Sequence, residues 1–117
     1  LSREEVYDLV HTLPDQEVAW IESDTERRDT YREILKRGNH RELAGLIKTL
    51  YQHKQERERA GRKFHLVDER LLTQAERLLH GEIAHVLNIG PEKVVPFIVG
   101  ELNVAHPTSE SETPVGS

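Results

Sequence analysis

The sequence contains no cysteine and no methionine, and it has one tryptophan among few aromatic residues. Without cysteine, disulfides and thiolate chemistry are excluded, which suits a reducing cytoplasm. No apolar run approaches the roughly 20 residues of a membrane-spanning helix, and no signal-peptide pattern stands at the start. Methionine is missing even at position 1, so we expect this chain to be the C-terminal part of a longer cytoplasmic protein.

The composition predicts one domain with a thin core. Of the 117 residues, 36% are apolar and 32% are charged, which allows a single modest core of Leu, Ile and Val. The net charge is −5, yet residues 27–63 hold 12 Lys and Arg against 5 Asp and Glu, whereas the remainder is strongly acidic. This asymmetry indicates a basic face for a polyanion, although charge alone fits simple solvation of charged helices equally well or better.

Two long segments, 39–59 and 67–87, carry apolar residues at the spacing of one helix face. The stripes are Leu43, Leu46, Ile47, Leu50 and Tyr51 in the first, and Leu71, Leu72, Ala75, Leu78, Leu79, Ile83, Val86 and Leu87 in the second. Gly61 lies in the short polar connection, where it can adopt a left-handed conformation. The pattern predicts an antiparallel helical hairpin at the centre of the fold. We expect Phe64 and Leu66 to pack back onto it, and the polar turns 52–59 to project past the core.

Shorter helices are expected around the hairpin. Residues 2–13 begin with a capping box of Ser2 and Glu5 and stop at Pro14. A second helix should be N-capped by Asp24 or Thr25 and end at Gly38, while residues 15–24 before it fit either a short helix or an extended connection.

A last helix is expected from residue 91 to about 102, with its start bent or delayed by Pro96. From residue 103 onward, Pro, Ser, Thr and Glu predict a disordered tail. The expected fold class is therefore all-α, a compact bundle of about five helices over residues 1–102.

Catalytic and metal-binding patterns are missing from the sequence. His80 and His85 are five residues apart, unlike the four-residue spacing of a helical metal pair. No glycine-rich phosphate loop or nucleophile elbow is present. Glu82 lies on the apolar side of its helix, where we expect a hydrogen-bonded carboxylate that fixes helix packing. We therefore expect no enzyme activity, no catalytic residue, no metal and no cofactor.

Trp20 is the strongest functional candidate. A lone tryptophan beside a helix start is most often a core anchor, but this one lies among acidic residues without a clean apolar stripe. A partly exposed indole can serve as a wedge or stacking surface for nucleic acid bases. Arg28 and Arg32 then share a helix face that Lys36 continues, close to a helix start with free amide donors for phosphate.

The order of these features resembles the C-terminal domain of the CarD/CdnL transcription regulators. The resemblance covers about residues 2–102. It rests on the tryptophan before a basic helix, the glycine-ended turn, and the segments LIKTLY at 46–51, KQER at 54–57, DERLL at 68–72 and AERLLHGEIA at 75–84.

This resemblance implies a nucleoid-associated regulator of transcription. In the family, a small N-terminal β domain, which is not in this sequence, holds the β subunit of RNA polymerase. The C-terminal domain places a tryptophan in the minor groove at the upstream edge of the melted promoter and stabilises the open complex. Carried over, Trp20 is the wedge and the following arginines contact phosphates. The full set expected on DNA is Trp20, Arg27, Arg28, Arg32, Lys36, Arg62, Lys63 and Arg70.

Two other classes of function stay open at this point. The polar hairpin end and the basic face are also suited to an acidic partner protein, in which case the domain is an interaction module without DNA contact. Self-association is a third possibility, because a domain with a thin core can pair its helices or exchange the first one. Exposure of Trp20 beside the arginines favours DNA, and its burial beneath the first helix favours a structural role.

Overall fold

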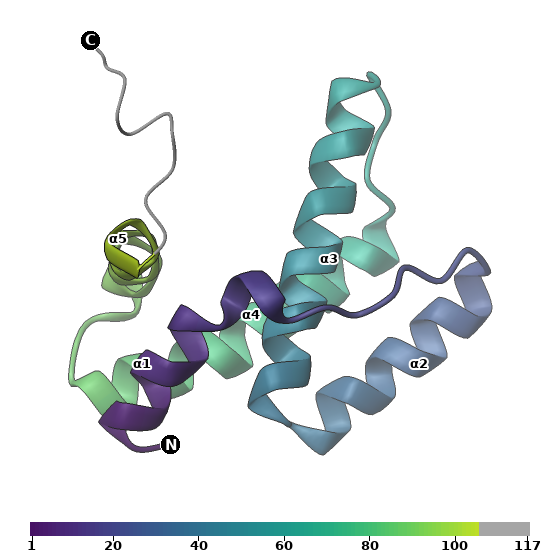
Figure 1. The fold of residues 1–117 in the computed structure, drawn as a ribbon. Helices are drawn as coiled ribbons and strands as arrows, with labels where there is room; N and C mark the ends of the chain where they lie inside the picture. Colours follow the sequence, from purple (N-terminus) through teal and green to yellow (C-terminus); the bar gives the residue numbers. More distant parts are fainter. Residues whose placement is uncertain (106–117) are drawn as a thin grey trace, which may run out of the picture.

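The computed structural model describes residues 1–105, which form five α-helices and two 3₁₀ turns, with no strand in that range (Figure 1). In chain order these are α1 (Arg3–His11), η1 (Leu13–Asp15), α2 (Asp24–Arg37), α3 (His40–Arg59), α4 (Leu66–Leu87), η2 (Pro91–Lys93) and α5 (Val94–Ala105). The predicted all-α class with about five helices is confirmed. Over the same residues, no helix is both long and apolar enough to cross a bilayer.

The helix ends follow local capping chemistry. Ser2 and Glu5 form the predicted capping box at α1. The N-cap of α2 is Ser23, whose hydroxyl accepts from the backbone of Glu26 at 3.3 Å; the prediction of Asp24 or Thr25 was wrong because serine one residue earlier satisfies the same donor. Gly38 ends α2 with φ of 65°, the left-handed geometry that favours glycine.

Helices α3 and α4 form the predicted hairpin and run in opposite directions. His40 at the start of α3 lies 2.9 Å from Glu82 near the end of α4, and Lys54 near the end of α3 lies 3.0 Å from Glu69 near the start of α4. The connection turns at Gly61, with φ of 73°. The last turns of α3 and this connection stand out from the rest of the domain, as predicted (Figure 1).

The core is built from all five helices, with α4 behind α1 and α3 in the view of Figure 1. Phe64 packs against the core as expected, but Leu66 is 63% exposed. That expectation was wrong because α4 begins at Leu66, which places this side chain off the helix face that carries Leu71 and Leu72. Tyr51 and Leu78 belong to the predicted stripes yet are about half exposed, so each stripe is wider than the surface that neighbouring helices cover.

Helix α5 begins at Val94, which agrees with the delayed start expected from Pro96, and it ends at Ala105, later than the predicted end near residue 102. The segment begins with the 3₁₀ turn η2, and Pro96 lies in the first turn of α5, where its missing N–H removes no intrahelical bond. The expected disorder from residue 103 was wrong for residues 103–105, which belong to α5. The rest of the expected tail, residues 106–117, lies outside the described residues.

Glu82 links α3 and α4 at the edge of the core. Its carboxylate contacts His40 on α3 at 2.9 Å. The hydrogen bond from His40 is the main cause that lowers the pKa of Glu82. The side chain is 38% exposed. It is therefore a partly buried, hydrogen-bonded carboxylate that holds helices together, as predicted.

Candidate nucleic-acid interface

Trp20 lies on a loop, residues 16–22, that crosses the face of α3 on its way to α2 (Figure 1). The loop has no helix, which settles the two alternatives left open for this segment. It approaches α3 at Gly45, where a β-carbon would lie 3.0 Å from Val18 Cγ2 and 3.3 Å from the Glu17 backbone. Glycine at this helical position therefore allows backbone and helix to touch.

Side chains from α2 and α3 bind the carbonyl groups along this loop. Thr49 donates to Val18 O at 2.6 Å, and Lys48 donates to Pro14 O at 2.8 Å and Gln16 O at 3.2 Å. From α2, the buried Tyr31 donates its hydroxyl to Ala19 O at 2.7 Å. Because these carbonyls accept no backbone hydrogen bond from residues 1–105, the side-chain donors satisfy their hydrogen-bonding capacity and hold the loop in place.

The indole of Trp20 is partly buried and has two close neighbours. The imidazole of His53 on α3 stacks on it, with ring centroids 3.5 Å apart and planes 11° from parallel. The guanidinium carbon of Arg27 lies 4.4 Å from the indole centroid, a cation–π geometry. Trp20 is thus neither freely exposed nor buried beneath α1. It is held in one orientation, with the imidazole of His53 stacked on the ring and the guanidinium of Arg27 over it.

Arg27 is a structural residue. It is 4% exposed, and it donates to both oxygens of Asp68 on α4 at 3.0 Å, to Asp24 at 2.8 Å and to Ile21 O at 2.9 Å. Burial opposes its charge, but the hydrogen bonds of Asp68 and Asp24 outweigh this and raise the pKa of Arg27. The prediction that Arg27 contacts a phosphate was therefore wrong, because its N–H donors bind oxygens of the protein.

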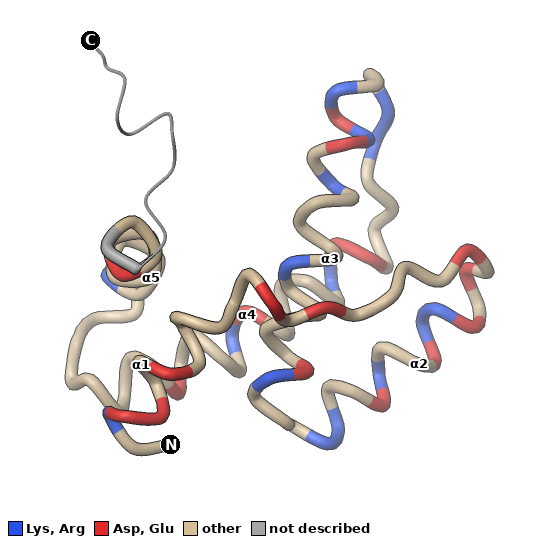
Figure 2. Tube along the Cα trace, viewed as in Figure 1, with Lys and Arg blue, Asp and Glu red and all other residues tan. Residues whose placement is uncertain are grey.

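Of the other expected cations of α2, Arg32 and Lys36 are exposed, whereas Arg28 is half-buried and its Nε is a buried atom without a hydrogen-bond partner among the described residues. Arg28 lies 3.6 Å from Asp29, and Lys36 lies 3.9 Å from Glu33. These are loose surface pairs, which are weak in water. Arg32 is exposed and has no ionic partner among residues 1–105. Red and blue alternate along α2 in Figure 2, so this face is a mixed surface in which Arg32 is the cation least neutralised.

Arg62, Lys63 and Arg70 lie apart from α2, and all three are exposed. Arg62 and Lys63 are at the projecting hairpin tip, which is blue in Figure 2, and Arg70 is in the second turn of α4. The start of α4 is joined to α2 by the hydrogen bonds between Arg27 and Asp68. The predicted set therefore divides into a group on α2, the helix to which the Trp20 loop is fixed, and a hairpin group.

Sequence reasoning missed the residues that hold the site together. They are Asp68, His53, Gly45, Lys48 and Thr49. Each contacts a residue that is distant in the sequence, so no local spacing pattern predicts its role. The only signal was chemical: a glycine inside a helix, and an aspartate in the first turn of an otherwise apolar stripe.

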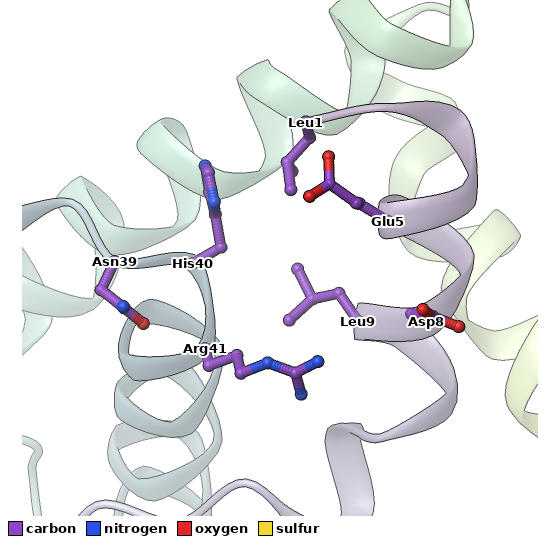
Figure 3. Close-up of a pocket in the computed structure, with 7 residues that line it drawn as sticks. All are labelled: Leu1, Glu5, Asp8, Leu9, Asn39, His40 and Arg41. Carbon is purple, nitrogen blue, oxygen red and sulfur yellow. The ribbon is translucent and has the colours of Figure 1, made fainter.

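A cleft of about 310 Å³ lies between α1 and the start of α3 (Figure 3). Its polar groups do not converge, because the carboxylate of Glu5 points toward Leu1 while that of Asp8 points away from the cleft. Arg41 donates to Thr12 at 3.1 Å. Residues 1–105 contain no group of three or more side chains arranged to hold a metal ion.

Comparison with known families decides what these features have in common. The family model for the CarD C-terminal domain matches residues 8–99, more than three quarters of the chain. This chain belongs to the CarD family. The resemblance inferred from the sequence is thereby confirmed, and the protein is related to transcription through a family that interacts with RNA polymerase and DNA. No curated protein and no solved structure matches the sequence.

Proposed function

We propose that this CarD-family domain contacts promoter DNA at the upstream edge of the melted region while its protein is held on RNA polymerase, and that it does so without catalysis of its own. The observation that carries this proposal is the Trp20 loop, which Arg27 and Tyr31 fix to α2, together with the exposed Arg32 and the half-buried Arg28 on that same helix. An aromatic group held in one orientation next to cations can meet a nucleic acid without first being ordered.

The roles on this interface follow the geometry. Arg28, Arg32 and Lys36 contact phosphates, and Arg32 contributes most because no carboxylate neutralises it. Trp20 presents the ring edge that His53 and Arg27 do not cover to a distorted, easily unstacked step of the duplex. Arg27 acts indirectly by holding the indole. The hairpin cations Arg62 and Lys63, with Arg70, supply further phosphate contacts away from the wedge.

The energetics suit a tethered DNA contact. A few phosphate contacts give weak, salt-sensitive and sequence-tolerant binding. Tethering to RNA polymerase through the rest of the protein raises the effective DNA concentration to roughly the millimolar range. Weak contacts are then sufficient for binding. A net charge of −5 keeps the domain from binding DNA indiscriminately in the absence of that tether.

The test is titration of the protein with a promoter fork-junction duplex, read by the fluorescence of Trp20, the single tryptophan. We expect a saturable change that weakens as salt rises. Arg28→Ala/Arg32→Ala should weaken binding and reduce the slope of log K against log salt by about 2. Arg77→Ala is the matched control for loss of charge, because Arg77 is an exposed cation on α4 outside the predicted DNA-contacting set. It should change neither the binding constant nor the salt slope.

The outcomes separate the competing classes. An equal effect of Arg32→Ala and Arg77→Ala means that only net charge matters and contradicts an α2 interface. Absence of any fluorescence change at low salt contradicts DNA contact through Trp20. An acidic partner protein that competes for the same arginines then becomes the better explanation.

A further inference from the structure

A polar stripe on α3 supports the loop that carries Trp20. Its members, Gly45, Lys48, Thr49 and His53, recur at helical spacing and so share one side of the helix. Gly45 leaves room for the loop backbone, and Lys48 and Thr49 donate to carbonyl groups of the loop. His53, one helical turn after Thr49, stacks on the indole. The stripe therefore follows the loop as it crosses α3 and ends at the candidate wedge (Figure 1).

The contact of His53 with Trp20 is separable from the core. The imidazole plane lies 11° from the indole plane, with centroids 3.5 Å apart, and the His53 side chain is 26% exposed. Its ionic neighbour is Glu56 on the same helix, at the loose distance of 3.7 Å. Arg27 also lies over the indole, but its loss would break the buried pair with Asp68. His53 is therefore an indole contact that can be changed without loss of a buried ion pair.

We propose that His53 is a positioning residue for the contact of Trp20 with DNA, an inference that rests on the proposed function above. The stacked imidazole restricts rotation of the indole, so the ring edge that stays uncovered keeps one direction before DNA arrives. Ordering a mobile side chain on binding lowers affinity, and this cost is avoided when the side chain is already held. His53 therefore acts through Trp20 and needs no contact of its own with the DNA.

A direct contact of His53 with phosphate would have a different signature. Each cation that meets a phosphate adds about 1 to the magnitude of the slope of log K against log salt. Loss of a positioning residue removes no phosphate contact, so affinity should fall at every salt concentration while the slope stays the same. The half-buried, stacked imidazole favours the positioning role.

Anisotropy of a fluorescein-labelled promoter fork-junction duplex, titrated with the full chain, measures binding without use of Trp20 emission. His53→Ala should weaken binding by about two- to tenfold, the usual cost of one interfacial side chain that must be ordered, with an unchanged salt slope. His53→Phe keeps a flat ring beside the indole and should recover most of the affinity. Gln52→Ala, at an exposed neighbouring position of α3, is the matched control and should bind like the wild type.

A double-mutant cycle with Trp20 shows whether His53 acts through the indole. Trp20→Ala should weaken binding more than His53→Ala does, and adding His53→Ala to Trp20→Ala should cause no further loss. Time-resolved anisotropy of the single tryptophan in the free protein gives a second readout, because local motion of the indole should increase in His53→Ala and not in Gln52→Ala. Circular dichroism melts check that each variant is folded. His53→Leu, which fills the space without a flat ring, replaces His53→Ala if alanine unfolds the chain.

The outcomes separate this inference from the proposed function. A His53→Ala variant that binds like the wild type, a loss that persists in the Trp20→Ala background, or a salt slope reduced by about 1 overturns the positioning role while DNA contact through the domain stands. Failure of His53→Phe to recover affinity also overturns it, because the flat ring then does not carry the effect. A wild type that does not bind the duplex, or a Trp20→Ala variant that binds equally well, contradicts the proposed function and this inference with it.

Discussion

Arg27 on α2 and Asp68 on α4 form a two-fold hydrogen-bonded ion pair that is almost wholly closed to solvent, with both N–O distances at 3.0 Å. The same guanidinium lies over Trp20 and donates to Ile21 O in the loop that carries it. One side chain thus joins helix packing to the orientation of the candidate wedge.

Removing Asp68 should therefore damage both stability and the loop. Asp68→Ala leaves a buried guanidinium without its main counter-charge, and we expect a loss of about 3–5 kcal/mol in the free energy of unfolding measured in urea. Asp24→Ala, which removes the exposed partner of Arg27, should cost clearly less. The apolar double variant Arg27→Met/Asp68→Leu should recover most of the loss; if it is no more stable than Asp68→Ala, the penalty does not come from an uncompensated charge.

The helices were predictable because each contains its own evidence. The stripe from Leu71 to Leu87, the capping box of Ser2 and Glu5, and the left-handed Gly38 are all local patterns. The errors arose where local signals compete: Ser23 and Asp24 are both good caps, and only the folded chain selects one. The helical state of residues 103–105 depends on the continuation of α5, and the polar sequence that follows from residue 106 gave no indication of where the helix ends.

The interface was less predictable because its decisive partners are distant in sequence. From position alone, Arg27 and Arg28 are equivalent cations. Packing separates them, because Arg27 is buried against α4 and meets Asp68, 41 residues away, while Arg28 stays half-exposed. The stacking of His53 on Trp20 likewise depends on the path of a loop that has no periodic pattern.

Gly45 gives a test of how tightly that loop lies on α3. Alanine in a helix interior is normally favoured over glycine by about 1 kcal/mol. Gly45→Ala should instead destabilise the protein, because the new methyl group meets the Glu17 backbone at 3.3 Å and the loop is held by other hydrogen bonds. Gly81→Ala, with no atom within 4 Å of the added carbon, should stabilise by about 0.5–1 kcal/mol. Urea denaturation of both variants decides, and equal stabilisation contradicts a close contact.

His53 should control the environment of Trp20. His53→Ala uncovers one face of the indole, so we expect a red-shifted emission maximum and a loss of about 1 kcal/mol in stability, the usual value of a ring pair. His53→Phe keeps a flat ring at this position and should preserve most of the emission spectrum. An unchanged spectrum in His53→Ala would show that the ring is protected by other groups.

His80 should make stability depend on pH near neutrality. It lines an apolar groove between α3, α4 and α5, where burial lowers its pKa below the ordinary 6.5, against the opposing charge of Glu76. As pH falls through 6.5, the unfolded chain gains this proton before the folded chain does, so the folded state loses stability. The loss grows until the lower folded-state pKa is reached and is constant below it.

The comparison that isolates this effect is His80→Gln against His85→Gln, which replaces an exposed histidine on the same helix. Urea unfolding at several pH values from about 8 to about 5 should give a stability difference between His80→Gln and wild type that moves in favour of the variant as pH falls. His85→Gln should parallel the wild type. A difference that is constant with pH would mean that His80 titrates alike in both states, and an opposite slope would mean that the folded groove stabilises its charged form.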